Sequence, residues 1–218
     1  MKVKWLGHAS FLITADNGTR VITDPYQSSA DGGMVGYAKI NESADVVAVS
    51  HEHGDHNYVS DVSGNPAVVR GVGSHQAAGI DFRGVESYHD TAQGAQRGPN
   101  TLFCFTVDDV RICHLGDLGH QLSQATLDEI GEVDLLLAVA GGGPTIDLPE
   151  LNQLVENISP RVVIPMHFTN ENCTYTRYTA DDFAQGKASV RRPASSETSL
   201  SPSQLPQTTE VVILDHAL

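Results

Sequence analysis

One short segment constrains this chain more than any other. It is Ser50-His51-Glu52-His53-Gly54-Asp55-His56, which directly follows the apolar run Val46–Val49. Neutral imidazole and carboxylate, the side chains concentrated here, are ligands that suit zinc, manganese or iron. In a tight turn after a strand, His51 and His53 can point to one side while Asp55 and His56 reach a second point. That arrangement suits two ions, which lie about 3.5–4 Å apart in two-metal hydrolytic sites.

The size and composition of the chain fit one enzyme domain. A chain of 218 residues can bury a core large enough to hold a rigid site, so we expect a single domain over residues 1–218. The longest apolar stretches, such as Leu135–Ala140, are far shorter than the ~20 residues of a membrane helix. Three cysteines without a Cys-x-x-Cys pair, and no signal-peptide apolar region, favour a cytoplasmic protein.

The net charge of the chain limits the kinds of partner that it can bind. Thirteen basic and 27 acidic side chains give a net charge of −14, which repels nucleic acid and anionic membranes. The basic pair Arg191-Arg192 is too small for a nucleic-acid site. We therefore expect a small-molecule substrate, no membrane partner and no nucleic acid, although a nuclease with a metal-focused pocket stays open as an alternative.

Short apolar strands and a few helices account for most of the pattern. The segments Ser123–Ile130, Leu148–Ile158 and Thr179–Gln185 predict helices, and Gly186–Thr209 predicts a loop. Asp16-Asn17-Gly18 and Asp108-Asp109 predict hairpin turns. Runs rich in Val, Ile, Phe and Thr predict strands over Lys2–Leu6, Ser10–Thr14, Arg20–Thr23, Asp45–Ser50, Ala67–Val69, Val85–Tyr88, Thr101–Val107, Val110–Leu115, Leu135–Ala138, Val162–Pro165 and Glu210–Leu214.

Ligand-type residues follow five of these strands. Asp24, His51 and His89 come directly after a strand, and Asp117 and His167 come two residues after one. If those strands share an edge, their ends build one site, which is where α/β folds place their chemistry.

The His-x-His-x-Asp-His segment resembles the signature of the metallo-β-lactamase superfamily. The resemblance extends over nearly the full length, is weakest over Gln27–Asn41 and Asn170–Gln207, and is strongest to the compact branch of ascorbate-6-phosphate lactonase-like and metal-dependent hydrolase proteins. It implies an α/β fold of the αββα sandwich type, with metals held in loops at one edge of two sheets. Further motifs in the order of that branch are Trp5-Leu6-Gly7-His8-Ala9-Ser10, Thr23-Asp24-Pro25, His89-Asp90, His114-Leu115-Gly116-Asp117 and Ile164-Pro165-Met166-His167.

The resemblance also implies roles for single residues. The first metal would be held by His51, His53 and His89, the second by Asp55, His56 and His167, and Asp117 would bridge them. Asp24 would accept hydrogen bonds that orient the His-rich loop, with His8 beside the ligands. The implied cofactors are two divalent ions, zinc first, with manganese or iron as alternatives. Because zinc β-lactamases of the common classes lack the bridging aspartate, antibiotic hydrolysis is not expected.

The implied activity is hydrolysis. A metal-bridging hydroxide would attack an ester, lactone or phosphodiester centre of a small substrate. The alternatives are a phosphodiesterase or nuclease, and a non-hydrolytic di-iron redox or metal-binding protein on the same fold. The intact set of seven ligands argues against a scaffold without catalysis. Substrate choice is expected to depend on pocket loops at Gln27–Asn41 and Asn170–Arg192.

Several polar residues have two interpretations. His75 and His114 compete with His89 for the third ligand position, but we expect His75 on the surface at a helix start and His114 buried and hydrogen-bonded. His120, like His8, either takes part in catalysis as a proton donor or substrate contact, or only packs.

Three further features lie near the expected site or the end of the chain. Arg97 binds an anionic substrate group or belongs to a turn that Asn100 fixes. Gly141–Pro144 lacks a phosphate-loop pattern and predicts a turn beside the pocket. His216 is expected on the surface.

Overall fold

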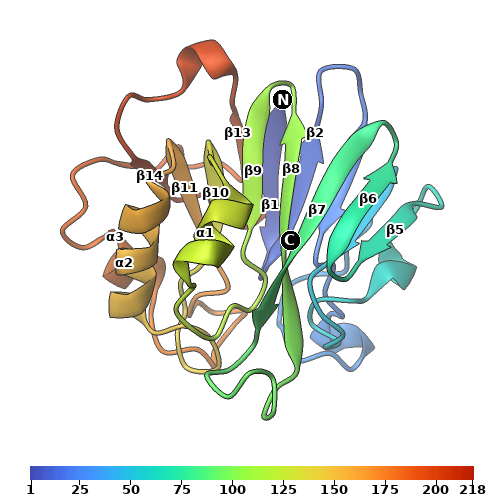
Figure 1. The fold of residues 1–218 in the computed structure, drawn as a ribbon. Helices are drawn as coiled ribbons and strands as arrows, with labels where there is room; N and C mark the ends of the chain where they lie inside the picture. The colour runs from blue at the N-terminus through green and yellow to red at the C-terminus, as the bar shows by residue number, and fades with distance from the viewer.

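Two mixed β-sheets face each other in the computed structural model, which describes residues 1–218 (Figure 1). The first sheet has the order β13 (Glu197–Ser199), β1 (Lys2–Gly7), β2 (Ser10–Thr14), β3 (Arg20–Thr23), β4 (Val46–Val49), β5 (Ala67–Arg70). The second has the order β12 (Val190–Arg191), β14 (Glu210–Val212), β11 (Val162–Met166), β10 (Leu135–Val139), β9 (Val110–His114), β8 (Pro99–Val107), β7 (Ile80–Tyr88), β6 (Gly73–Ala77).

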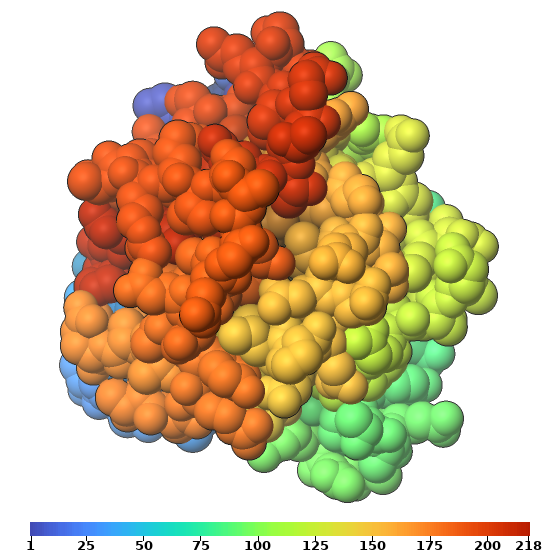
Figure 2. Space-filling view, turned by 90° about the vertical axis from the view of Figure 1, so that its left-hand side faces the viewer, coloured from blue at the N-terminus to red at the C-terminus, as the bar shows by residue number.

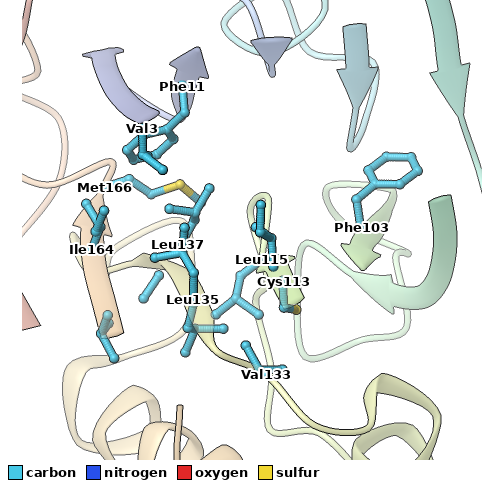
Figure 3. Close-up of a cluster of buried hydrophobic side chains, with 14 of the residues drawn as sticks. Val3, Phe11, Phe103, Cys113, Leu115, Val133, Leu135, Leu137, Ile164 and Met166 are labelled. Carbon is cyan, nitrogen blue, oxygen red and sulfur yellow. The ribbon is translucent and has the colours of Figure 1, made fainter. Parts of the chain in front are cut away.

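The main core lies between the sheets, because alternate side chains of a strand point to opposite faces. In β2, Phe11 and Ile13 join the core between the sheets, whereas Leu12 joins a smaller core on the outer face. In Figure 3, Phe11 faces the second sheet across the gap, with Leu137 and Met166 on the opposite side. Three strands are wholly buried, namely β4, β10 and β11, and all three are continuous apolar runs.

Helices cover one outer face of this sandwich. In Figure 1, α1 (Gln124–Ile130), α2 (Leu148–Ile158) and α3 (Ala180–Ala184) lie against the second sheet, on the side away from β1 and β2. Leu151 and Leu154 lie on the inner face of α2 and are buried in the core. None of the helices is long and apolar enough to cross a membrane.

The outer face of the first sheet has a different cover. Residues 26–44 and the chain near Val62 pack Tyr26, Tyr37 and Ile40 against Leu12 and other outward side chains of this sheet. The regular elements in this layer are the 3₁₀ turns Ser29–Asp31 and Val59–Asp61. The expected α/β sandwich is confirmed, but this outer layer is irregular chain instead of α-helix.

Each of the predicted strands and helices is present, and both hairpin turns join the strands as expected. Three strands were missed. The predicted loop Gly186–Thr209 is wrong in part, because it contains β12 and β13, and β13 pairs with β1. The chain after β11, orange and red in Figure 2, covers one side of the molecule. His75 lies in β6 and not at a helix start.

The topology brings the predicted ligands to one end of the sandwich. Strands β3 and β4 are parallel in the first sheet. In the second sheet β9, β10 and β11 are parallel, and β7 has the same direction because two antiparallel pairings separate it from β9. Within each sheet the carboxyl ends of the strands that precede Asp24, His51, His89, Asp117 and His167 therefore share an edge. The contacts of Asp117 with His51 and His56 bring the two edges together.

The buried strand β10 allows a test of this packing. Leu137→Ala removes a fully buried side chain from the core between the sheets and should lower the free energy of unfolding by about 2–5 kcal/mol. Val68→Ala, at a position 42% exposed in β5, should change it by less than about 0.5 kcal/mol. Urea unfolding followed by circular dichroism measures both; equal losses would contradict the assigned core.

Candidate metal centre

Two clusters of possible metal ligands that share no residue lie at this edge, and a third group, Asp24, His51 and His56, overlaps both. The ligand atoms of each cluster fall within 4.8 Å of one another. The first cluster is His51, His53 and His89, and the second is His8, Asp55, His56 and His167. Six of these seven residues are the predicted ligands of the first and second metal, divided as predicted.

Asp117 lies between the two clusters. Its Oδ2 is 3.0 Å from Nε2 of His89 in the first cluster and 3.3 Å from Nε2 of His167 in the second. Its Oδ1 is 3.3 Å from Nε2 of His56. One carboxylate thus faces both clusters, which is the position expected of a bridging ligand.

The turn that carries Asp117 is held by Asn100. The Asn100 Oδ1 accepts from the Asp117 backbone N–H at 2.9 Å, and its Nδ2 donates to the Leu115 carbonyl at 3.0 Å. Gly116 between them has φ of +53°, and a Cβ there would lie 2.6 Å from Ser50 and still closer to Asn100. A side chain at Gly116 would therefore displace the turn.

Asp24 organises the His-rich loop from behind. Its carboxylate accepts from the Ser50 backbone N–H at 2.7 Å, from Ser50 Oγ at 2.6 Å and from His56 Nδ1 at 2.8 Å. Because the Ser50 hydroxyl proton goes to Asp24, Ser50 Oγ accepts from His51 Nδ1 at 2.9 Å. His51 is then the tautomer whose Nε2 lone pair is free for a metal, and His56 directs its Nε2 away from Asp24.

A second set of contacts surrounds Asp55. Tyr175, which follows β11, donates its O–H to Asp55 Oδ2 at 2.9 Å, and His8 Nε2 lies 3.3 Å from the same oxygen. Burial, followed by the nearby Asp55 carboxylate, raises the pKa of Tyr175 far above its usual range, so the phenol stays a donor. The other oxygen of Asp55, Oδ1, is buried without a partner.

The loop between β7 and β8 is held by Asp90. Its two carboxylate oxygens accept from the backbone N–H groups of Ala92, Gly94, Gln96 and Arg97 at 2.7–3.0 Å. Burial alone would raise the pKa of Asp90, but these four donors outweigh it and lower the pKa. The His89 N–H also donates to the Gly98 carbonyl at 3.1 Å, so one closed loop carries both His89 and Arg97.

The donor atoms of the two clusters fit metal ions. Ligand atoms that are buried and lack a hydrogen-bond partner include Asp55 Oδ1, His56 Nε2, Asp117 Oδ1 and His167 Nε2. Burial lowers the pKa of His51 to about 3, so this imidazole is neutral and its lone pair is available. For Asp117, burial is outweighed by His167 and His56, which hold its pKa well below the usual range and keep it anionic. Buried polar atoms without partners are costly unless an ion or water satisfies them.

A cavity of about 560 Å³ opens onto these clusters. Its other walls are formed by Met34, Arg97, Gly143, Pro144, Tyr175 and Arg177. As expected, both predicted pocket loops and the Gly141–Pro144 turn contribute to it. A larger cavity of about 810 Å³ lies over β6–β9 and α1 and contains none of the clustered ligands, so size alone does not mark the site.

Comparison with known proteins agrees with this geometry. The model of the β-lactamase superfamily domain matches residues 2–167. The chain belongs to this family. It is 31% identical over 206 residues to a UPF0173 protein of Pyrococcus furiosus, covering 84% of this chain and 89% of that protein. A UPF0173 metal-dependent hydrolase of Thermococcus onnurineus is 29% identical, covering 77% and 84%.

A solved structure extends the comparison to the fold. A Thermotoga maritima protein assigned to the Zn-dependent hydrolases of the metallo-β-lactamase superfamily superposes with a TM-score of 0.79 and 32% identity, over 98% of this chain and 97% of that one. The chain is therefore an enzyme of the metal-dependent hydrolase class in the metallo-β-lactamase superfamily.

Two histidines that the sequence offered as candidates, His120 and His114, lie outside the ligand clusters. His120 is not among the residues that line the cavity: its Nε2 accepts from the Tyr88 backbone N–H at 3.1 Å and its Nδ1 lies 2.8 Å from the Gln121 carbonyl. The geometry therefore gives no support to a catalytic role for His120. His114, as expected, is buried, with Nε2 2.9 Å from the Ala9 carbonyl.

Two more histidines, His75 and His216, lie outside the clusters, and two residues that belong to the site were not predicted. His75 Nε2 lies 2.9 Å from the Gly71 carbonyl, remote from the clusters. His216 is half-buried against Trp5, not a simple surface residue. Tyr175 and Asp90 were missed as parts of the site. Asp90 before a glycine-containing stretch was a readable turn signal, whereas Tyr175 had no signal beyond its place in an expected pocket loop.

The Asp90 contacts predict a local change of dynamics. Asp90→Asn removes the negative charge and one of two acceptor oxygens, so the amides of Ala92, Gly94, Gln96 and Arg97 should exchange with solvent at least about tenfold faster. Hydrogen exchange followed by mass spectrometry measures this. The exposed Asp215→Asn is the control, and unchanged exchange in Asp90→Asn would show that the carboxylate does not hold the loop.

Proposed function

We propose that the chain is a dinuclear metal-dependent hydrolase that acts on an ester, lactone or phosphodiester centre of a small substrate. The observation that carries the proposal is the place of Asp117. Its carboxylate lies within 3.3 Å of ring nitrogens from both ligand clusters. Several buried atoms of these residues form no hydrogen bond, and bound metal ions would account for that.

The two ions would divide the ligands between them. His51, His53 and His89 would hold the first, and Asp55, His56 and His167 the second, with Asp117 shared. Asp24 and Ser50 support this assignment, because they direct Nε2 of His51 and His56 toward Asp117. His8 would orient Asp55 instead of binding metal, since its Nε2 is already next to Asp55 Oδ2 and the Tyr175 hydroxyl.

Bound divalent ions would supply Lewis acidity, polarising the reacting centre and lowering the pKa of water toward ~7. The protein supplies the rest. Tyr175, which is 40% exposed, lies on the cavity wall, and its O–H holds Asp55 through a hydrogen bond of 2.9 Å to Oδ2. The histidine and carboxylate ligands fit zinc, which we propose as the native metal, and they also accept manganese and iron.

Metal analysis tests the number of ions. Protein loaded with metal and freed of excess should carry close to two ions per chain, because seven ligands exceed the needs of one tetrahedral zinc. Elemental analysis measures this, and a single ion with no second site on titration would contradict the dinuclear centre. A colourless zinc or manganese protein would also exclude the di-iron redox alternative, which should absorb visible light.

A substrate screen then tests the reaction. Metal-loaded protein should hydrolyse members of a lactone and ester library, with Asp55→Ala as the inactive blank. Hydrolysis of bis-p-nitrophenyl phosphate in preference to lactones would favour the phosphodiesterase alternative. If metal-loaded wild-type protein hydrolysed no member of the library and no phosphodiester, the result would contradict the proposal.

The shared carboxylate gives a sharper prediction. Asp117→Ala removes a ligand of both ions, whereas His167→Ala removes a ligand of one. We therefore expect Asp117→Ala to lose activity by several orders of magnitude and to retain less metal than His167→Ala, with a lower melting temperature because bound metal stabilises the fold. Metal content after dialysis and thermal unfolding measure both effects. Two tightly bound ions and normal turnover in Asp117→Ala would refute the bridge.

A further inference from the structure

Arg97 differs from the other basic residues of this chain. Of its thirteen lysine and arginine side chains, Arg97 is the one for which the structure shows neither a hydrogen bond nor an ion pair. Acidic side chains outnumber basic ones by about two to one, so partners are plentiful. An arginine without one, on the wall of the cavity that holds both ligand clusters, needs another explanation.

The backbone of Arg97 is fixed even though its side chain is free. Its N–H donates to Asp90 Oδ2 at 2.7 Å, and the neighbouring Gly98 carbonyl accepts from the His89 N–H. The closed loop therefore sets Arg97 opposite a ligand of the first cluster. This is an ordered position for a cation, and the side chain itself is exposed to the cavity solvent.

The charged side chains of the cavity wall that are not candidate metal ligands are both cationic. Apart from the clustered ligands and Asp117, the polar side chains of its wall are Arg97, Arg177 and Tyr175, with no further carboxylate. Arg177 is held only loosely, 3.5 Å from Asp147, and is 61% exposed. In a chain of net charge −14, two cations at the mouth of one cavity make a local anion site.

We infer that Arg97 binds an anionic group on the substrate, with Arg177 as a second cation, so that the enzyme prefers esters or lactones carrying a separate carboxylate or phosphate. This inference rests on the proposed function for the reaction but not for the anion site. The planar guanidinium donates two parallel hydrogen bonds to either kind of oxyanion. The exposed Met34 on the same wall gives the rest of the substrate an apolar surface.

The first test measures binding without turnover. Inorganic phosphate and, separately, acetate are titrated into metal-loaded wild-type, Arg97→Met and Arg192→Met proteins by calorimetry at low ionic strength. Arg192 is the matched control, since it loses the same charge but pairs with Asp181 away from the cavity. Arg97→Met should raise the dissociation constant of at least one anion about tenfold or more, and Arg192→Met should not. The anion that responds more identifies the preferred group.

The second test compares two esters of similar size. Wild-type enzyme should cleave the mono-p-nitrophenyl ester of succinic acid with a kcat/KM at least about tenfold above that of p-nitrophenyl butyrate. Arg97→Met should lose this preference, whereas Arg192→Met should keep it. Arg97→Met indistinguishable from Arg192→Met in both tests would overturn the inference while leaving the hydrolase proposal intact. A wild type that cleaves neither ester, with the expected change in anion binding, would support the anion site and weigh against ester hydrolysis.

Discussion

The buried carboxylate of Asp24 is the contact on which the site depends. It is fully inaccessible to solvent and accepts three hydrogen bonds, two from Ser50 and one from His56. A buried carboxylate that loses its partners is strongly destabilising, so the end of β3 and the loop after β4 adopt their conformations together. The left-handed φ of +37° at Asp24 turns the chain sharply at this point, and aspartate tolerates such a backbone better than most residues do.

These hydrogen bonds also fix which ring nitrogen of His51 and His56 points toward Asp117. Asp24 and Ser50 engage Nδ1 of His56 and His51, so that Nε2 of each faces Asp117. Asn100 fixes Asp117 from the opposite side by holding its backbone. The donor set is therefore preorganised by neutral and charged hydrogen bonds of the protein, and an ion would replace repulsion between close donor atoms with coordination.

Much of the site was predictable because its ligands follow strands, and the strands have apolar sequences that differ clearly from their surroundings. The missed elements explain the limit of that approach. β6 and β13 consist mainly of polar or small residues and are held by backbone pairing with β7 and β1, which leaves little pattern in the side chains. His120 follows a ligand motif, but whether its ring turned to the cavity or to the Tyr88 backbone depended on a tertiary contact. Tyr175 reaches Asp55 across 120 positions of sequence, and no local spacing reveals such a contact.

Two walls of the cavity differ in whether they share a loop with a candidate metal ligand. Arg97 shares one Asp90-anchored loop with His89, so a change of that loop would alter substrate contacts and the first ligand cluster together. Met34 belongs to a segment without ligands, which is joined to the Tyr175 loop through the Gly36 N–H and the Asn172 carbonyl at 2.7 Å. That second wall can vary in shape while the strand-end ligands stay in place. If Arg97 binds an anionic group as we propose, that preference is coupled to the first ligand cluster through the shared loop, whereas the wall at Met34 can change without altering the candidate ligands.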